Sequence, residues 1–256
     1  MNRNFLALLL VGTLSSVAFG QHSDIAFGYD DISDPMAIII ENDNRTSEGF
    51  QFFESEFGRA FAADPLTTDD PGFETELTDD ETLTFNPGDS VWLRVLNAST
   101  QSDFGQGYVN FYNPGSGTLE ASGEIRVFED FTSTTTDLLL NGTQILSGDN
   151  PQLIGIGDDS ADDPGGVHEH LEFELTGEVV GAYGLLVQVD ADFGNAGDGF
   201  DLSSDPFWLI INNGLSEDEF ENRALPQFGV VPEPASAVIL TAGVGAMFLR
   251  RRRKSC

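Results

Sequence analysis

Apolar and polar residues alternate along several short segments of this 256-residue chain. Residues 90–97 place valine and leucine on one face, and residues 170–177 repeat the pattern with leucine and phenylalanine. Alternation with a period of two is typical of a half-buried β-strand. Turn-forming pairs such as Asn141-Gly142 separate these segments. The pattern predicts an all-β protein, an antiparallel β-sandwich of jelly-roll-like form.

One segment near the end of the chain departs from this alternation. Ser216 is followed three residues later by Glu219, the arrangement of a helix-capping box, and apolar residues then recur at helical spacing. We therefore expect one short C-terminal helix over 216–225. Residues 62–82, by contrast, are rich in Asp, Thr and Pro, which predicts a long surface loop.

The chain has a single cysteine, Cys256, so it cannot form an intramolecular disulfide. Its stability must come from the packing of an apolar core. The 21 phenylalanines and the hydrophobic content of 40% favour a folded domain over a disordered acidic chain. We expect one such domain at 21–229, between two terminal segments with other roles.

Acidic residues dominate the chain, which carries 43 of them against 11 basic residues and has a net charge of −32. More than half of the basic residues are Arg3 and the cluster at 250–254, so the body between the two ends is strongly acidic. Such a surface repels nucleic acid and attracts cations. It also has the wrong sign for an acidic polysaccharide, unless a divalent ion bridges the two. We expect no nucleic-acid partner.

The N-terminal segment has the pattern of a secretory signal. Arg3 precedes an apolar run at 5–14, and Ala18 and Gly20 are the small residues of a cleavage site before Gln21. We predict a signal peptide at 1–20 that signal peptidase removes on export. An uncleaved anchor is the alternative.

The C-terminal segment 230–256 combines an apolar run with a positive cluster. Residues 235–249 would extend about 22 Å as a helix, which is short for the roughly 30 Å hydrocarbon core of a membrane. Terminal arginines can extend their side chains to the headgroups, and positive charge is retained on the cytoplasmic side. We expect a transmembrane helix at 235–249 that is stopped by Arg250, Arg251, Arg252 and Arg253.

Pro232, Glu233 and Pro234, followed by the apolar run and the arginines, resemble the PEP-CTERM sorting signal of bacterial exported proteins. The resemblance implies processing by an exosortase, a membrane enzyme that cuts near the Pro-Glu-Pro and releases the protein or transfers it to the cell surface. Bacteria with this system often produce exopolysaccharide. The protein would then be held in the inner membrane only transiently. A permanent single-span tail anchor is the alternative.

The three histidines indicate a candidate metal site. His168 and His170 are two positions apart on an expected strand, so both imidazoles lie on one face and can reach one ion. His22 and Asp24, near the expected mature N-terminus, are candidates for further ligands, and the set suits zinc. Two surface histidines without a metal are the alternative.

The same residues are similar to those of a bacterial family. His168, His170 and Phe173, with Gly181 and Tyr183 after them, resemble the His-x-His repeat of surface-anchored proteins whose domain begins with a His-x-Asp-Ile-like strand. The Asn-Trp of that family is replaced here by Glu-Phe. The family is often associated with zinc or manganese uptake, so the resemblance implies a metal-related role at the surface.

A second candidate ion site lies in the acidic segment 190–201. Oxygen-rich loops suit Ca²⁺, which accepts about six to eight oxygen ligands in irregular geometry. The segment is not an EF-hand, because Gly194 stands where an oxygen ligand is needed, and a solvated acidic turn is the alternative. The candidate calcium ligands are Asp190, Asp192, Asn195, Asp198 and Asp201.

The sequence lacks the common enzyme motifs: it has no Gly-x-Ser-x-Gly, no phosphate-binding glycine loop and no His-Glu-x-x-His. We expect an exported, non-enzymatic protein of the cell surface or extracellular matrix. Its expected partners are signal peptidase and exosortase as processing enzymes, with exopolysaccharide as a candidate ligand. The alternatives are a zinc-binding surface protein that uses His22, His168 and His170, and a carbohydrate-binding β-sandwich.

Overall fold

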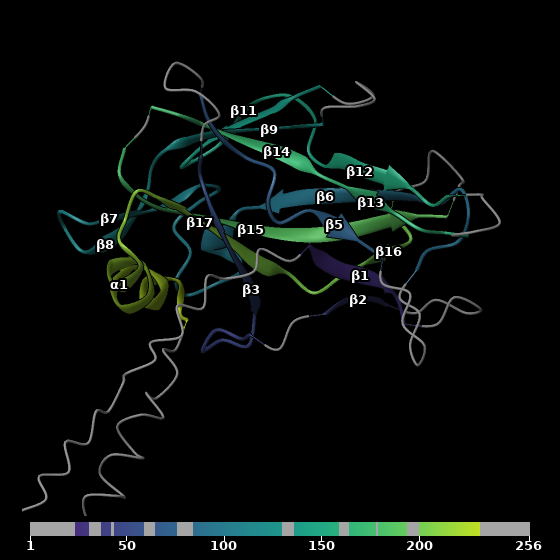
Figure 1. The fold of residues 1–256 in the computed structure, drawn as a ribbon, viewed down its shortest axis with the longest axis horizontal. Helices are drawn as coiled ribbons and strands as arrows, with labels where there is room; N and C mark the ends of the chain where they lie inside the picture. Colours follow the sequence, from purple (N-terminus) through teal and green to yellow (C-terminus); the bar gives the residue numbers. More distant parts are fainter. Residues whose placement is uncertain are drawn as a thin grey trace, which may run out of the picture.

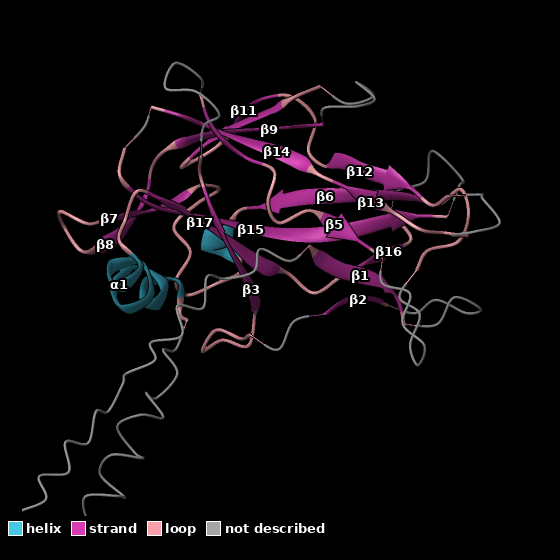
Figure 2. Cartoon of the chain, viewed as in Figure 1, coloured by secondary structure: helices cyan, strands magenta, loops and turns pink. Residues whose placement is uncertain are grey.

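The computed structural model describes residues 24–30, 37–41, 44–58, 65–75, 84–129, 136–158, 164–177, 179–193 and 200–230. The expected signal peptide, the Pro-Glu-Pro motif, the helix at 235–249 and the terminal arginines lie outside these residues. The described part is mostly β-structure with a short helical segment (Figure 2), which confirms the all-β prediction.

The strands form three sheets, and Figure 1 labels their strands. The first has the order β13-β5-β1-β2, with β1 at Ile25–Tyr29, β2 at Ile38–Glu41, β5 at Phe73–Glu74 and β13 at His168–Glu169. The second has the order β11-β10-β9-β14-β4, with β4 at Leu66–Thr68, β9 at Glu124–Glu129, β10 at Leu138–Asn141, β11 at Ile145–Ser147 and β14 at Leu171–Thr176.

The third and largest sheet has eight strands. Its main path is β12-β6-β15-β17-β3, with β16 and the β7–β8 hairpin paired to β15. The strands are β3 at Gln51–Glu56, β6 at Ser90–Leu96, β7 at Asn110–Asn113, β8 at Thr118–Ala121, β12 at Gln152–Ile156, β15 at Gly181–Asp192, β16 at Leu202–Ser203 and β17 at Phe207–Asn213. A short 3₁₀ turn, η1 at Ala98–Thr100, follows β6.

Two strand pairs are parallel, so the prediction of antiparallel pairing is wrong for them. β1 pairs with β5, and β3 pairs with β17, both in parallel, whereas the other named pairs are antiparallel. Both parallel pairs join segments that are far apart in the sequence, and such pairs need a long connection. Alternation of apolar residues identifies a strand but carries no information on the direction of its neighbour.

One apolar core lies between the three sheets. Alternate residues of β6 and β14 are buried in it, as their sequence pattern predicted. Ile25 and Phe27 of β1 join the same core and are fully buried. The strand that begins next to Asp24 is therefore fixed by apolar packing.

A second core covers the opposite face of the largest sheet, so β17 is buried at every position. The cover is a helical segment made of α1 (Glu217–Glu219), η2 (Phe220–Ala224) and η3 (Leu225–Phe228), at the left of Figure 1. Ser216 caps it, because its hydroxyl accepts a hydrogen bond from the amide of Glu219 (3.3 Å). The predicted helix is confirmed and is a few residues longer than expected.

The acidic segment at 62–82 is more than a surface loop, and that prediction is wrong in part. The segment contains β4 and β5, and Phe73 of β5 is fully buried. Each strand is too short to show a recognisable period of two. Their tertiary partners, which are distant in sequence, give them their conformation.

Candidate metal centre

Three chain segments meet in the first sheet, near its edge strand β13. Asp24 directly precedes β1, His168 lies in β13, and His170 lies between β13 and β14. β5 connects them, since it pairs with β1 through Ile25 and Phe73 and with β13 through Glu74 and His168. This register places the start of β1 beside the two histidines.

The donor atoms of Asp24, His168 and His170 all lie within 4.8 Å of one another. Oδ2 of Asp24 is 3.3 Å from Nε2 of His168, and its Oδ1 is 3.9 Å from Nε2 of His170. The two imidazole centroids are 5.5 Å apart. The prediction that His168 and His170 face one ion together with Asp24 is therefore matched by a candidate two-histidine, one-carboxylate group.

The other nitrogen of each ring faces an oxygen atom. Nδ1 of His170 lies 2.9 Å from the carbonyl oxygen of Asp69, an acceptor that assigns the proton to Nδ1 and leaves the lone pair on Nε2. Nδ1 of His168 lies 3.8 Å from a carboxylate oxygen of Glu74. Metal-ligating histidines usually have an outer oxygen partner that orients the ring. His170 has such a hydrogen bond, whereas the distance from His168 to Glu74 exceeds that of a hydrogen bond.

Gly72 shapes the space between two of the ligands. Its amide donates a hydrogen bond to Oδ1 of Asp24 (3.1 Å), which orients the carboxylate. A Cβ at this position would lie 2.7 Å from Nε2 of His170 and 2.8 Å from Oδ1 of Asp24. The absence of a side chain at Gly72 therefore keeps a cradle open between these two donor atoms.

The group is open to solvent on one side. The side chain of His168 is 58% exposed, compared with 34% for His170 and 21% for Asp24. An ion would therefore sit near the surface, with His168 as its most accessible ligand. Sequence reasoning missed the supporting residues Gly72 and Glu74, because only the pairing of β5 with β1 and β13 brings them here.

His22, the remaining histidine, lies outside the described residues. It is two positions before Asp24, a separation of about 7 Å in an extended chain. Its contribution to the metal centre stays a prediction.

The surroundings of the acidic segment 190–201 favour calcium binding less than those of the histidines favour zinc binding. The buried carboxylate of Asp190 forms an ion pair with Arg94 (2.7 Å) and accepts a hydrogen bond from Ser203 on its other oxygen (2.5 Å). Both oxygens are thus bonded within the protein, which indicates a structural role for Asp190. Asn195 and Asp198 lie outside the described residues, and the calcium site stays a prediction.

Asp192 and Asp201 influence a buried tyrosine, Tyr29. Burial raises the pKa of this tyrosine, as does the hydrogen bond that it donates to Asp89 (2.7 Å), and the charges of Asp201 and Asp192 act in the same direction. Asp201 also accepts a hydrogen bond from the amide of Phe193 (2.9 Å). The two carboxylates thus belong to the surroundings of a buried tyrosine.

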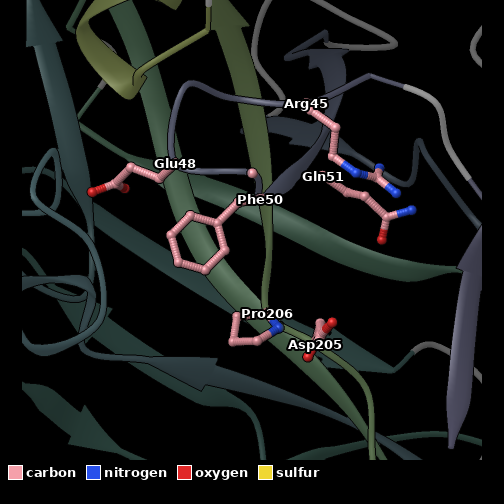
Figure 3. Close-up of a pocket in the computed structure, with 7 residues that line it drawn as sticks. Arg45, Glu48, Phe50, Gln51, Asp205 and Pro206 are labelled. Atoms are coloured by element: carbon pink, nitrogen blue, oxygen red, sulfur yellow. The ribbon is translucent and has the colours of Figure 1, made fainter.

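A separate pocket of about 240 Å³ lies between the turn at 45–51 and the chain before β17 (Figure 3). Arg45, Phe50 and Asp205 are among its lining residues. The carboxylate of Glu48 accepts hydrogen bonds from Ser102 and from the amide of Asp103, so it is held against a neighbouring loop. The pocket contains none of the residues of the candidate metal centre.

No family model, no curated protein and no solved structure matches this chain. Its own fold and site define its class: an all-β protein with a two-histidine, one-carboxylate candidate metal centre. Within the part of the chain that the structure describes, no helix has both the length and the apolar character needed to cross a membrane.

Proposed function

We propose that this chain is an exported, non-enzymatic protein of the cell surface or extracellular matrix, and that its folded part binds zinc through Asp24, His168 and His170. The observation that carries the proposal is the convergence of these three donors from separate segments of the chain. Zinc accepts this combination of imidazole nitrogen and carboxylate oxygen.

The distances between Asp24 and the two histidines fit a shared metal ion better than direct hydrogen bonds between carboxylate and imidazole. Two ligands about 2.1 Å from a tetrahedral zinc ion are about 3.4 Å apart. Each Nε2 atom lies close to this separation from one oxygen of Asp24, that of His168 at 3.3 Å from Oδ2 and that of His170 at 3.9 Å from Oδ1. They exceed the roughly 2.7 to 2.9 Å of a charge-assisted hydrogen bond between imidazolium and carboxylate.

Charge supports the same proposal. The chain has a net charge of −32, so its surface concentrates divalent cations from solution. Charge alone would hold such cations loosely anywhere on the surface. The oriented Nε2 atoms of His168 and His170 distinguish this group from an ordinary acidic surface and favour zinc over calcium.

Zinc titration of the full chain, purified with a histidine-free affinity tag, tests this proposal. We expect zinc to raise the melting temperature of the protein and His168→Ala or His170→Ala to remove most of this shift. Asp24→Asn removes the charge with little change in shape, and Glu217→Gln removes an exposed carboxylate on the helical segment as a matched control. A melting temperature that does not respond to zinc would refute the metal site.

The proposed export and sorting rest on the terminal sequences. Signal peptidase would cut before Gln21, and an exosortase would act near Pro232, Glu233 and Pro234 after the helix at 235–249 has held the protein in the inner membrane. Mass spectrometry of the surface-exposed protein should then show a C-terminus near Pro234. Recovery of a chain that still ends at Cys256 would contradict processing.

A carbohydrate-binding sandwich is the second candidate, and the pocket in Figure 3 favours it. Phe50 offers an aromatic surface there, next to the polar side chains of Arg45 and Asp205. However, the amide of Gln51 already donates to the carbonyl of Ile40 (2.5 Å), and Glu48 is bonded to a neighbouring loop. Fewer polar groups thus remain for a sugar, and this function ranks below zinc binding.

A further inference from the structure

We infer that a zinc ion held by Asp24, His168 and His170 keeps a coordination position open to solvent and binds there a carboxylate group from outside the chain. This inference rests on the proposed zinc site and names the ligand that the site would recognise. The protein would then be a metal-dependent receptor for carboxylate-bearing molecules.

The number of donors leaves room for such a ligand. Among the described residues, the group that converges has three donors. Structural zinc sites are closed by four protein ligands, whereas sites with three keep a position for water or another ligand. The oxygens that Asp69 and Glu74 bring to the two rings lie nearest Nδ1, at 2.9 Å for His170 and 3.8 Å for His168, on the other side of each ring from Nε2.

Access to the open position follows from burial. Gly72 lies against His170 and Asp24, so near that a Cβ there would clash with both donors, and these two side chains are the less exposed of the three ligands. His168 forms the outer side and has the most exposed side chain of the three. An incoming ligand would therefore reach the ion past His168.

The positive charge of the bound ion favours an anionic ligand at the open coordination position. The group has a single carboxylate, that of Asp24, to set against the two positive charges of a divalent ion. The bound ion would therefore leave an excess of positive charge at the site, and a bound cation is often the strongest local charge in its surroundings. Three of the arginines in the described part, Arg94, Arg126 and Arg223, are already paired with carboxylates. An anionic ligand would therefore be repelled by the metal-free protein and attracted once the ion is bound.

A small carboxylate or a uronate sugar fits this centre better than a second copy of the chain. Two copies would each carry a net charge of −32, and their mutual repulsion would oppose a metal-bridged dimer. A single carboxylate on a small molecule meets far less of this repulsion. Free carboxylic acids and uronate sugars share the ligand chemistry, and binding experiments separate them.

The test uses the full chain loaded with Co²⁺, which replaces zinc and reports its coordination through its visible spectrum. Acetate and glucuronate are the probes, and glucose is the matched control because it has the same ring without the carboxylate. We expect both probes to shift the spectrum in a saturable way, with an affinity at least tenfold above that of glucose. Tighter binding of glucuronate than of acetate would assign the sugar ring a share of the contact, and equal binding would assign the carboxylate alone.

Several results would overturn the inference. If zinc and cobalt bind but no carboxylate changes the spectrum, the open position is absent while the zinc site stands. If carboxylate binds only to the His22→Ala variant, His22 occupies the position in the natural chain. If the metal produces a dimer in sedimentation and glucuronate does not disperse it, the external ligand is a second copy. If no metal binds at all, the proposed zinc site itself fails, which the preceding titration reveals separately.

Discussion

Replacement of Gly72 by alanine tests the metal centre without removing any ligand. The new Cβ would lie 2.5 Å from Cε1 and 2.7 Å from Nε2 of His170, and 2.8 Å from Oδ1 of Asp24. Ordinary carbon contacts begin at about 3.5 Å, so the ring of His170 must move by about 1 Å. The backbone at this glycine does not adopt a positive φ, so alanine adds no backbone strain.

This displacement should affect the metal much more than the fold. The new Cβ would meet the ring of His170, and this side chain is partly exposed and can rotate away. We therefore expect the free energy of unfolding of the metal-free protein to change by less than about 1 kcal/mol. Metal ligands tolerate shifts of only about 0.2 Å, and changes in the supporting residues of such sites typically weaken binding about 10- to 100-fold. We expect a loss of zinc affinity in that range.

Two measurements check this prediction: a zinc titration in competition with a chromophoric chelator, and denaturant unfolding of the metal-free protein. Gly58→Ala is the matched control, because a Cβ there would meet no atom within 4 Å. Equal zinc affinities for Gly72→Ala and Gly58→Ala would show that the cradle beside Gly72 does not hold the ion. A large loss of stability in Gly72→Ala would instead show that the residue supports the β1–β5 pair.

Three further predictions concern stability. Arg94→Ala should lower the free energy of unfolding by about 2 kcal/mol, because it leaves the buried Asp190 without its ion pair. Arg223→Ala, on the exposed helical surface, should lower it by less than about 1 kcal/mol, and urea titrations compare the two variants. Ser216→Ala should cost about 1 kcal/mol by removing the helix cap, as thermal unfolding would show. Burial raises the pKa of Tyr183 to about 12, so the stability that its neutral form provides is complete below pH 10.0 and falls as the pH rises towards 12. Tyr183→Phe should make stability less dependent on pH over that interval; an unchanged slope would contradict the assignment.

The sequence predicts the strands far better than the arrangement that forms the site. Period-two alternation in β6 and β14 identifies the buried face of each strand, because one face of each strand packs in the core. The spacing of His168 and His170 likewise shows that they share a face. The roles of Gly72 and Glu74 depend on the register of β5 with two distant strands, and no local pattern in a two-residue strand encodes that register.

The position of the group indicates what zinc would do to the protein. Asp24, Gly72 and the two histidines come from three distant parts of the chain, so an ion would join β1 to the segment that carries β13. Yet Ile25, Phe27 and Phe73 are already fully buried around this group, so apolar packing holds the segments together without a metal. Zinc should therefore bind to a protein that is already folded, unlike a zinc finger, which is unfolded without its metal. The gain in stability would then follow mass action, about 2.7 kcal/mol at a free zinc concentration of a hundred times Kd, and the metal-free chain should still unfold cooperatively. A metal-free chain without a cooperative transition would show that the ion is structural and would remove the reason to expect an open, ligand-binding position.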